Sequence, residues 1–496
     1  MFLWKNVIVV LAMLALATGP AYMLARSELE RSVTLRLAAA GALIASVTLS
    51  FLPEPFCQVL FGCLLLLCLD RRVPMVATYL FFLLWTPAAT GQLVAGGIYI
   101  APLGPILSFS LALLVGYHVH PNMRLRRRLN AADFYLIAFL IIFTVCASLR
   151  STGATILRNF LIYAAPYGLS YHILSRVRIE RPELVLRMFA YSGAAAGALC
   201  VFETLRYWPI YSGLAQMKGV WALLDTTNVM LFRAGLFRAL GPFAHPLTAS
   251  AELGMAGVAL IGLARLRGFT PPIVMLAIAV GAGLMATVSR TGIVMLFVGL
   301  VTMQLFRRRY ASIVAITVSG SILLFGTPLL SGQDAQANSA YRIMLLAGVP
   351  RALGGKLWLG YREAVQSHVL DAFVQGQGIV DLVNVYLSIA VNGGVVSLIP
   401  YLFFLGASFT QYRALKRAGP SEPQLILAQT CLSIQAGFAV SAFLMSAWGA
   451  PMQISFVCAA IIVALRAEMK THRQDAASPT RPSLMHTDFD RLPALS

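Results

Sequence analysis

The stretch at residues 232–254, FRAGLFRALGPFAHPLTASAELG, concentrates residues that could bind or transfer a charged group. Arg233 and Arg238 are followed by His245 and Pro246, after which the chain becomes apolar. Arginine binds phosphate oxygens through two parallel N–H donors and stays charged at physiological pH. The pattern predicts a binding site for an anion, such as a phosphate group, at the start of an apolar helix.

Composition indicates which elements must position these residues. Hydrophobic residues make up 59% of the 496 residues and charged residues only 11%, with a mean hydropathy of +0.78. Apolar runs close to the length that crosses a bilayer recur along the chain, which predicts an all-α polytopic membrane protein with about 12–15 transmembrane helices. The seven cysteines lie inside apolar runs without metal-ligand spacing, so we expect no metal site.

Basic residues are concentrated in short segments between the apolar runs. These segments are 71–72, 124–128, 176–181, 265–267, 307–309, 413–417 and 466–470. Short loops rich in lysine and arginine mark the cytoplasmic side of a membrane protein. The net charge of +19 is therefore interpreted as a topology signal, and we expect no nucleic-acid partner.

The apolar runs divide the chain into five parts. We expect N-terminal transmembrane segments in 1–128, core transmembrane helices in 129–330, a large periplasmic loop at 331–382, C-terminal transmembrane helices in 383–470 and a disordered cytoplasmic tail at 471–496. Spans are expected near 6–25, 37–52, 55–69, 73–88, 92–117, 132–148, 159–175, 188–207, 246–266, 270–287, 292–306, 312–330, 384–409, 424–445 and 450–466. Gly and Pro interrupt the run 92–117, so a re-entrant segment there is an alternative.

Two long loops, 208–245 and 331–382, fall on the side opposite to the basic loops. The second loop should contain one or two short amphipathic helices. The positive-inside rule should leave this face poor in arginine. It instead carries Arg150, Arg158, Arg206, Arg233, Arg238, Arg290, Arg342, Arg351 and Arg362. Several expected spans begin here, and helix N-termini attract anions through their free N–H groups. The alternative is that these arginines extend to lipid headgroups.

Glycines in the opening stretch indicate how its arginines could converge. Residues five apart on a helix point about 140° from each other, so Arg233 and Arg238 reach one ligand only if the chain bends. Gly235 and Gly241 permit such a bend. Pro246 is suited to the first position of the helix that follows, where its missing N–H has no consequence.

The same residues resemble a known family. RAGLFRALGPFAHPLTASAELG followed by LMATVSRTGIVMLFVGL is similar to the core of the O-antigen ligase and Wzy-type O-antigen polymerase superfamily. The loop near SAYRIML and the segment DLVNVYLSIAVNGGVVSLIPYL extend the resemblance to roughly residues 230–405. It implies a metal-independent glycosyltransferase without a cofactor, facing the periplasm from the bacterial inner membrane. The implied partners are an undecaprenyl-diphosphate-linked glycan donor, a glycan or lipid-linked acceptor, and membrane lipid.

The resemblance also implies roles for individual residues. A sugar hydroxyl would attack the donor, and cations would stabilise the diphosphate that leaves. Arg238 and Arg290 are the predicted catalytic cations. The predicted substrate-binding residues are Arg158, Arg233, His245, Arg342 and Asn384. Glu203 is added for another reason, because an acid inside an apolar span is a functional candidate, although pairing with Arg206 or a facing arginine is an equal alternative.

The general base distinguishes the branches of this superfamily. In the ligase branch a histidine commonly stands beside the asparagine that begins the helix after the loop, whereas here Val383 precedes Asn384. Asp381 is therefore the predicted catalytic base, with His245 and His368 as alternatives. This difference favours a polymerase of O-antigen or exopolysaccharide repeat units over a ligase that transfers glycan to lipid A core. A polysaccharide or lipid transporter is an alternative of another class, although we find no internal repeat to indicate it.

Reporter fusions test the predicted orientation. Alkaline phosphatase joined after residue 309 should be inactive, because the basic segment 307–309 is expected in the cytoplasm. The same enzyme joined after residue 333 should be active. The reverse pair of results would contradict the orientation.

Overall fold

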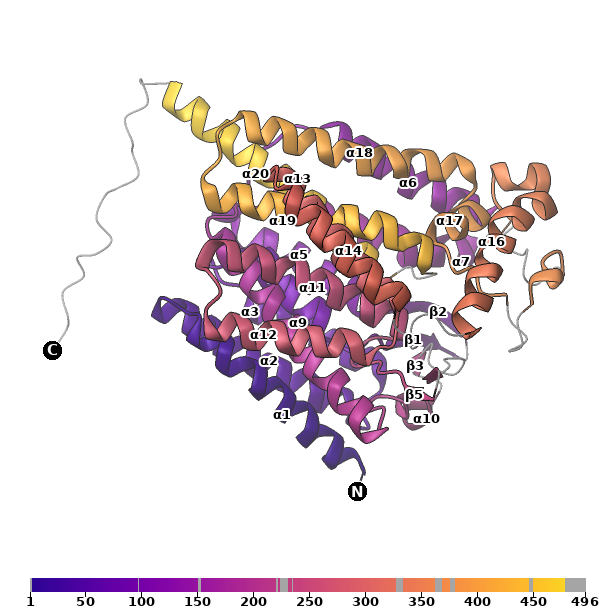
Figure 1. The fold of residues 1–496 in the computed structure, drawn as a ribbon. Helices are drawn as coiled ribbons and strands as arrows, with labels where there is room; N and C mark the ends of the chain where they lie inside the picture. The colour runs from indigo at the N-terminus through magenta and orange to yellow at the C-terminus, as the bar shows by residue number, and fades with distance from the viewer. Residues whose placement is uncertain are drawn as a thin grey trace.

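The computed structural model describes residues 2–96, 98–149, 153–219, 222–223, 231–233, 235–326, 333–361, 368–374, 380–445 and 449–477. Most of these residues are helical, and Figure 1 shows the long helices packed side by side. This architecture confirms the predicted class of a multi-span helical membrane protein.

The described helices and strands have the following bounds. The helices are α1 (Phe2–Met23), α2 (Glu28–Thr48), α3 (Glu54–Cys68), α4 (Met75–Trp85), α5 (Pro105–Val119), α6 (Ala131–Ser148), α7 (Gly153–Asn159), α8 (Ala165–Leu174), α9 (Pro182–Arg206), α10 (Leu214–Lys218), α11 (Pro246–Arg267), α12 (Pro271–Ala286), α13 (Arg290–Phe306), α14 (Tyr310–Gly326), α16 (Gln333–Leu353), α17 (Val385–Gly393), α18 (Val395–Arg417), α19 (Glu422–Ser441) and α20 (Ala450–Ala477). The strands are β1 (Thr90–Ala95), β2 (Ile98–Leu103), β3 (Ala222–Leu223), β4 (Phe232–Arg233) and β5 (Leu236–Phe237).

Helices long and apolar enough to cross a bilayer occur along the whole bundle. Within the described ranges there are seven: Trp4–Met23, Ala131–Ser148, Pro182–Arg206, Pro246–Arg267, Val395–Arg417, Glu422–Leu444 and Ala450–Thr471. Shorter apolar helices of 10–17 residues, including α3, α4, α5, α12 and α13, lie among them. These lengths and hydropathies support a multi-pass membrane protein.

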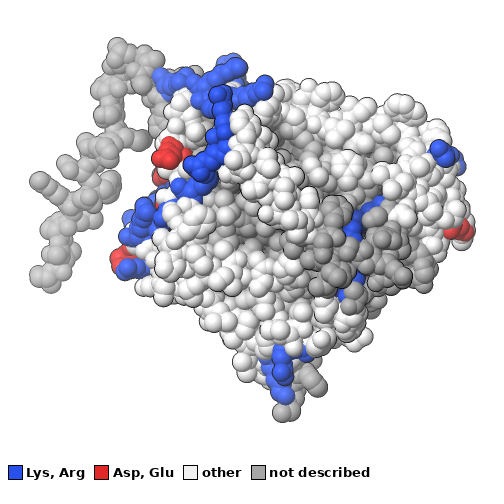
Figure 2. Space-filling model, in the orientation of Figure 1, with Lys and Arg blue, Asp and Glu red and all other residues white. Residues whose placement is uncertain are grey.

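The bundle has two chemically different ends. The basic segments gather at one end: side chains from 126–128 and 466–470 line one hollow, and the charges of Arg307 and Arg309 act on Arg265. Figure 2 shows a band of Lys and Arg side chains along the left edge, over the end where α18 meets α19 in Figure 1. We call this the basic end. The opposite end, which carries β1–β5 and α16, is called the hairpin end.

α9 and α11 form the centre of the bundle, and both are mostly buried. α9 packs against α1, α4, α11 and α12, whereas α11 also packs against α13. Small residues permit these close approaches. A Cβ atom at Gly193 of α9 would collide with Ala256 of α11, and one at Gly254 would lie 2.6 Å from the carbonyl oxygen of Gly292 in α13. The starts of α11 and α13 are therefore held side by side at the hairpin end.

Two of the spans expected from sequence have a different form in the structure. The run 92–117 is a β1–β2 hairpin followed by the 15-residue helix α5, because Gly and Pro interrupt its apolar sequence. The strands are short elements of the hairpin end: β1 pairs antiparallel with both β2 and β3, and β4 pairs with β5. The run 159–175 begins within α7, passes through a π-helical turn at Phe160–Ala164 and continues as α8.

Two further boundaries differ from the prediction. The expected span 384–409 is two helices, α17 and α18, which are separated at Gly394 with a φ of 80°. A Cβ atom at Gly394 would collide with the backbone carbonyl of Trp358, so the loop after α16 crosses over this break. The expected disordered tail at 471–496 begins too early, because α20 continues to Ala477. Residues 478–496 lie outside the described part of the chain.

Candidate functional site

A buried carboxylate at the end of α9 organises the hairpin end. The Glu203 side chain is fully buried, and its oxygens accept three backbone N–H groups, those of Ile210 (2.9 Å), Leu240 (2.9 Å) and Gly241 (2.7 Å). A buried carboxylate is tolerated when hydrogen bonds replace the water it has lost. Ile210 lies directly after α9, whereas Leu240 and Gly241 belong to the segment between β5 and α11. Glu203 therefore holds these segments against the end of α9.

The segment that leads to α11 bends at the glycines that the sequence identified. β4 and β5 form a short antiparallel hairpin that places Arg233 on its first strand and Arg238 directly after its second. Gly235 and Gly241 have φ values of 76° and 57°, in the left-handed region that favours glycine. A Cβ atom at Gly241 would lie only 2.8 Å from the Sγ atom of Cys200. The predicted bend is confirmed.

Arg238 is held against the end of α12. The side chain is 8% exposed, and its Nε atom donates to the carbonyl oxygen of Thr287 at 3.4 Å. The next residue, Ala239, donates its backbone N–H to the carbonyl oxygen of Ala286. Burial, and then the positive charge of Arg233, lower the pKa of Arg238 to about 10, so this guanidinium is charged at neutral pH.

Arg290 is the first residue of α13, and α11 fixes its position. The Ser250 hydroxyl of α11 accepts the backbone N–H of Gly292 at 3.0 Å and donates to the hydroxyl of Ser289 at 3.0 Å. This hydroxyl satisfies one of the free N–H groups at the start of α13. A Cβ atom at Gly292 would collide with the backbone of Ser250, so the close approach requires glycine.

Arg342 reaches the same region from α16. Its Nη2 atom donates to the carbonyl oxygen of Leu444 at 3.2 Å, and the hydroxyl of Thr291 donates to that same oxygen at 3.3 Å. Arg342 therefore lies close to the residue that follows Arg290. Burial and the charges of Arg233 and Arg290 lower the pKa of Arg342, and the Asp381 carboxylate partly opposes them.

These observations bring four arginines together, and we call Arg233, Arg238, Arg290 and Arg342 the arginine cluster. The charge of Arg233 acts on each of the other three. The buried Nε atoms of Arg290 and Arg342 have no hydrogen-bond partner in the described part of the chain. The Asp381 carboxylate acts on Arg342. A group of guanidinium side chains of this kind is suited to a multiply charged anion.

Two predicted binding residues have structural partners beside the cluster. The Nδ1 atom of His245 accepts the backbone N–H of Leu247 at 3.0 Å and so caps α11. Burial and the charge of Arg238 lower the pKa of His245 to about 4, which leaves its ring neutral at neutral pH. Asn384 caps α17 in the same way, because its Oδ1 atom accepts the backbone N–H of Leu387 at 3.1 Å.

The remaining predicted residues occupy separate places. Arg158 donates to the carbonyl oxygen of Tyr99 at 2.9 Å and stands 4.4 Å above its ring, in contact with the β1–β2 hairpin rather than with the cluster. The backbone carbonyl of Asp381 accepts the hydroxyl of Tyr341, the neighbour of Arg342, at 3.3 Å. His368 is exposed and pairs with Asp371 at 2.9 Å.

A cavity of about 380 Å³ lies next to the segment that joins Arg238 to α11. We call it the central cavity; its lining includes Thr86, Tyr99, Pro242, Phe243, Thr248 and Glu252. Glu252 of α11 is fully buried, and neither of its carboxylate oxygens has a hydrogen-bond partner in the described residues. A buried carboxyl group without a partner is costly, and such groups indicate sites where a ligand binds or a proton moves.

The sequence analysis did not identify Glu252. It is an acid inside an apolar run that was expected to cross the membrane, and this feature alone marks a candidate functional residue. The residues predicted from the sequence were instead Arg233, Arg238 and His245, which precede this run. The unsatisfied state of the carboxyl group became visible only in the folded chain.

Comparison with known proteins identifies no family. No family model matches the chain, and no curated protein matches its sequence.

The role of Glu203 as an organiser of the backbone can be tested by Glu203→Gln. The amide keeps one acceptor oxygen but places an N–H₂ donor where a backbone N–H now donates. We expect this change to reduce the free energy of unfolding by about 1–3 kcal/mol, the usual cost of an unsatisfied buried polar group.

Thermal unfolding in detergent measures this effect. Glu28→Gln is the matched control, because Glu28 is 88% exposed and pairs only with the exposed Arg31 in the described residues. Equal unfolding temperatures for the two variants would show that Glu203 does not hold the fold together.

Proposed function

We propose that this chain is a glycosyltransferase of the bacterial inner membrane. In this proposal it polymerises undecaprenyl-diphosphate-linked repeat units of O-antigen or exopolysaccharide at the periplasmic face. The observation that carries the proposal is the arginine cluster, in which guanidinium groups from β4, the segment after β5, α13 and α16 come together. A diphosphate provides dense negative charge and oxygen acceptors that guanidinium groups bind well. The resemblance of residues 230–405 to the O-antigen ligase and polymerase superfamily points to the same donor.

The proposed reaction uses the arginine cluster at the leaving group. An acceptor hydroxyl oxygen forms a bond with the anomeric carbon of the donor sugar, while the bond between that carbon and the diphosphate oxygen breaks. The bonding electrons move to the diphosphate, and the cluster stabilises the charge that develops there. The proton of the hydroxyl moves to a carboxylate. We assign this base to Asp381, because its charge acts on Arg342 and its backbone contacts the neighbouring Tyr341.

The central cavity provides a place for the sugar. Its wall includes Pro242 and Phe243, which belong to the same segment as Arg238, so a glycan there would lie near a diphosphate on the cluster. Glu252 lies six residues after Pro246, about 9 Å further along the axis of α11. In the proposal its carboxyl group binds sugar hydroxyls, because its oxygens have no hydrogen-bond partner among the described residues.

Substitutions in the cluster test the donor site. We expect Arg238→Ala to lower the turnover of a polyprenyl-diphosphate-linked donor by roughly 10²–10³-fold, as the loss of one preorganised donor to a developing charge does in other enzymes. Arg290→Lys should also impair turnover, because an ammonium cannot replace the planar fork of a guanidinium.

Arg351→Ala is the control for this experiment, because Arg351 is an exposed arginine of α16, the helix that also carries Arg342. Glycan output from all three variants close to that of the wild type would refute the donor site. A loss confined to Arg238→Ala and Arg290→Lys would support it.

Carboxyl variants test the base and the reaction type. Asp381→Asn should abolish long chains while the protein remains in the membrane, because an amide cannot accept the proton. Glu252→Gln should mainly weaken substrate binding, because an amide still forms hydrogen bonds with hydroxyls. The opposite ranking of the two variants would transfer the role of base to Glu252.

A deletion strain separates the polymerase from the ligase. Loss of the polymerase leaves single repeat units on the cell surface and no long chains. Full-length chains that accumulate on the lipid carrier without attachment to core would instead identify a ligase. Unchanged glycan with altered lipid or solute uptake would favour the transporter.

A further inference from the structure

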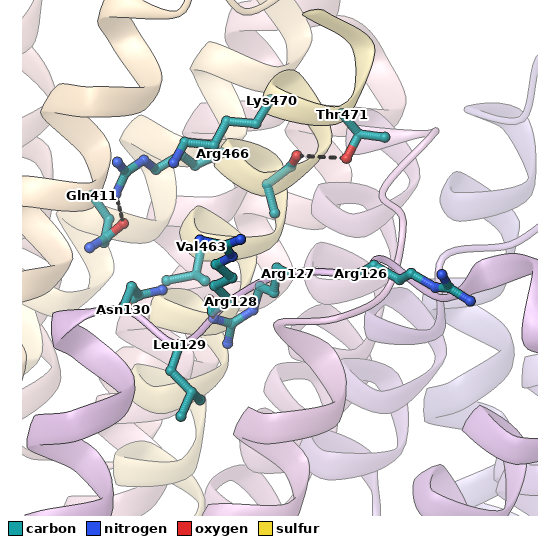
Figure 3. A pocket seen from close by; sticks show the side chains of 11 residues that line it. Arg126, Arg127, Arg128, Leu129, Asn130, Gln411, Val463, Arg466, Lys470 and Thr471 are labelled. Carbon is teal, nitrogen blue, oxygen red and sulfur yellow. Dashed lines mark hydrogen bonds between the residues drawn. The ribbon is translucent and has the colours of Figure 1, made fainter. Parts of the chain in front are cut away.

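A second hollow lies at the basic end of the bundle. It has a volume of about 550 Å³ and is bounded by the segment 126–130, by Gln411 of α18 and by the part of α20 from Val463 to Thr471. Figure 3 shows Arg466 and Lys470 on one side of it and Arg127 and Arg128 on the other. These residues are far apart in sequence, so only the packing of α18 and α20 near the start of α6 brings them together.

The lining of this hollow is strongly positive. Its lining includes Arg126, Arg127, Arg128, Arg466 and Lys470, and no acidic residue of the described ranges lines it. Asp133 lies behind the wall, where it accepts two bonds of 2.6 Å from Arg127 and one of 2.7 Å from the backbone N–H of Asn130. Arg127 is therefore neutralised, whereas the charges of Arg126, Arg128, Arg466 and Lys470 are uncompensated by the residues of the wall.

The hollow is held open by contacts that need no ligand. Arg127 also donates to the carbonyl and hydroxyl oxygens of Ser175, which fixes the segment between Arg126 and Arg128. Asn130 begins α6 with a capping box that includes Asp133. On the opposite wall, Arg466 donates to the side-chain oxygen of Gln411. A preformed site of this kind binds with a smaller entropic cost than one that must be ordered first.

A smaller hollow adjoins the first across the same two side chains. It has a volume of about 160 Å³, shares Arg466 and Lys470 with the larger hollow, and adds Arg417 and Arg473. Arg473 already donates to the carbonyl oxygen of Ala418 at 2.9 Å. Positive charge therefore continues from one hollow into the next, which suits an anion with more than one charged oxygen group.

The positive-inside rule accounts for the number of basic residues here but not for their arrangement. The segment 307–309 satisfies that rule with three arginines that are exposed on the turn between α13 and α14. The residues of the hollow differ, because they face one another across a concavity from separate elements. Basic pockets between transmembrane helices on the cytoplasmic side are a recurring binding site for anionic lipid headgroups.

An apolar surface runs outward from the same hollow. Leu129 lines the hollow and is 49% exposed. The next exposed apolar residues along α6 are Phe134, Ile137, Ile141 and Val145. Their spacing of three and four residues places them on one face of the helix. Acyl chains could follow this face while a headgroup occupies the hollow, an arrangement that a free phosphate ion would not use.

We propose that the hollow binds the phosphate-bearing headgroup of an acidic phospholipid, with its acyl chains along the exposed face of α6. Arg128, Arg466 and Lys470 would contact the phosphate oxygens. This site is separate from the arginine cluster and does not rest on the proposed function.

The double variant Arg128→Gln, Lys470→Gln tests the site, because both residues are exposed and their replacement should leave the fold intact. The control is Arg308→Gln, Arg309→Gln, which removes the same charge from exposed positions at the same end. Each purified full-length protein is delipidated in neutral detergent and titrated with phosphatidylglycerol, phosphatidylethanolamine or inorganic phosphate. Binding is followed by native mass spectrometry and by the shift of the unfolding temperature.

We expect wild type to retain phosphatidylglycerol in preference to phosphatidylethanolamine. The double variant in the hollow should bind phosphatidylglycerol about thirty-fold more weakly, because each basic side chain near an anionic headgroup contributes a factor of about five. The control should change by less than about twofold, because Arg308 and Arg309 do not line the hollow and exposed charges are screened by salt.

Three results would overturn the proposal. Equal weakening in both double variants would show a general effect of surface charge. Stabilisation by inorganic phosphate as large as that by phosphatidylglycerol would assign the hollow to a free phosphate rather than to a lipid. Equal retention of the two lipids by the wild type would show that the hollow does not select an acidic headgroup. If the double variant does not fold, Arg128→Gln alone replaces it, with Arg308→Gln as its control and an expected fivefold effect.

Discussion

The hydrogen bonds of one buried carboxylate determine the geometry of the hairpin end. Glu203 lies in the last turn of α9, a helix at the centre of the bundle, and its oxygens accept N–H groups from Ile210, Leu240 and Gly241. The cost of removing a carboxylate from water makes these bonds obligatory. These bonds hold the chain against α9 just after Arg238. Glu203 was predicted from the sequence to bind substrate; in the structure its oxygens accept the backbone N–H groups of segments that lead to Arg238 and α11.

The arginine cluster depends on this constraint and on the close packing of α11 against α13. Gly292 allows the first turn of α13 to approach Ser250, and this approach brings Arg290 towards the segment that Glu203 holds. Arg342 joins from α16 through the carbonyl oxygen of Leu444. Like charges that separate elements hold close together repel one another. In the proposed function a bound diphosphate reduces this repulsion.

The presence of basic residues has a different explanation at each end of the bundle. At the hairpin end Arg238 is buried and the charge of Arg233 acts on the other arginines of the cluster, an arrangement that suits the proposed anion. At the basic end the positive-inside rule already requires lysine and arginine, so charge alone indicates nothing further. There the concave arrangement of Arg128, Arg466 and Lys470 is the informative feature.

The sequence by itself determined the helical membrane class, the positions of most of the seven long apolar helices and the bend between Arg233 and Arg238. These features follow from local properties: apolar length, loop charge, and the freedom of Gly235 and Gly241 to adopt positive φ. Breaks within apolar runs were harder to place. At the break, the backbone of Trp358 approaches Gly394 closely, and no local sequence pattern predicts this contact.

The composition of the sites was decided only by the tertiary structure. Whether a polar group needs a ligand depends on the partners that distant segments supply. Glu203 finds three backbone donors, whereas the oxygens of Glu252, which is equally buried, have no hydrogen-bond partner in the described structure. Both are acids in apolar helices, and the sequence alone did not separate their roles. The difference arises because hydrogen-bond satisfaction is a property of the folded neighbourhood, not of the residue or of its place in the chain.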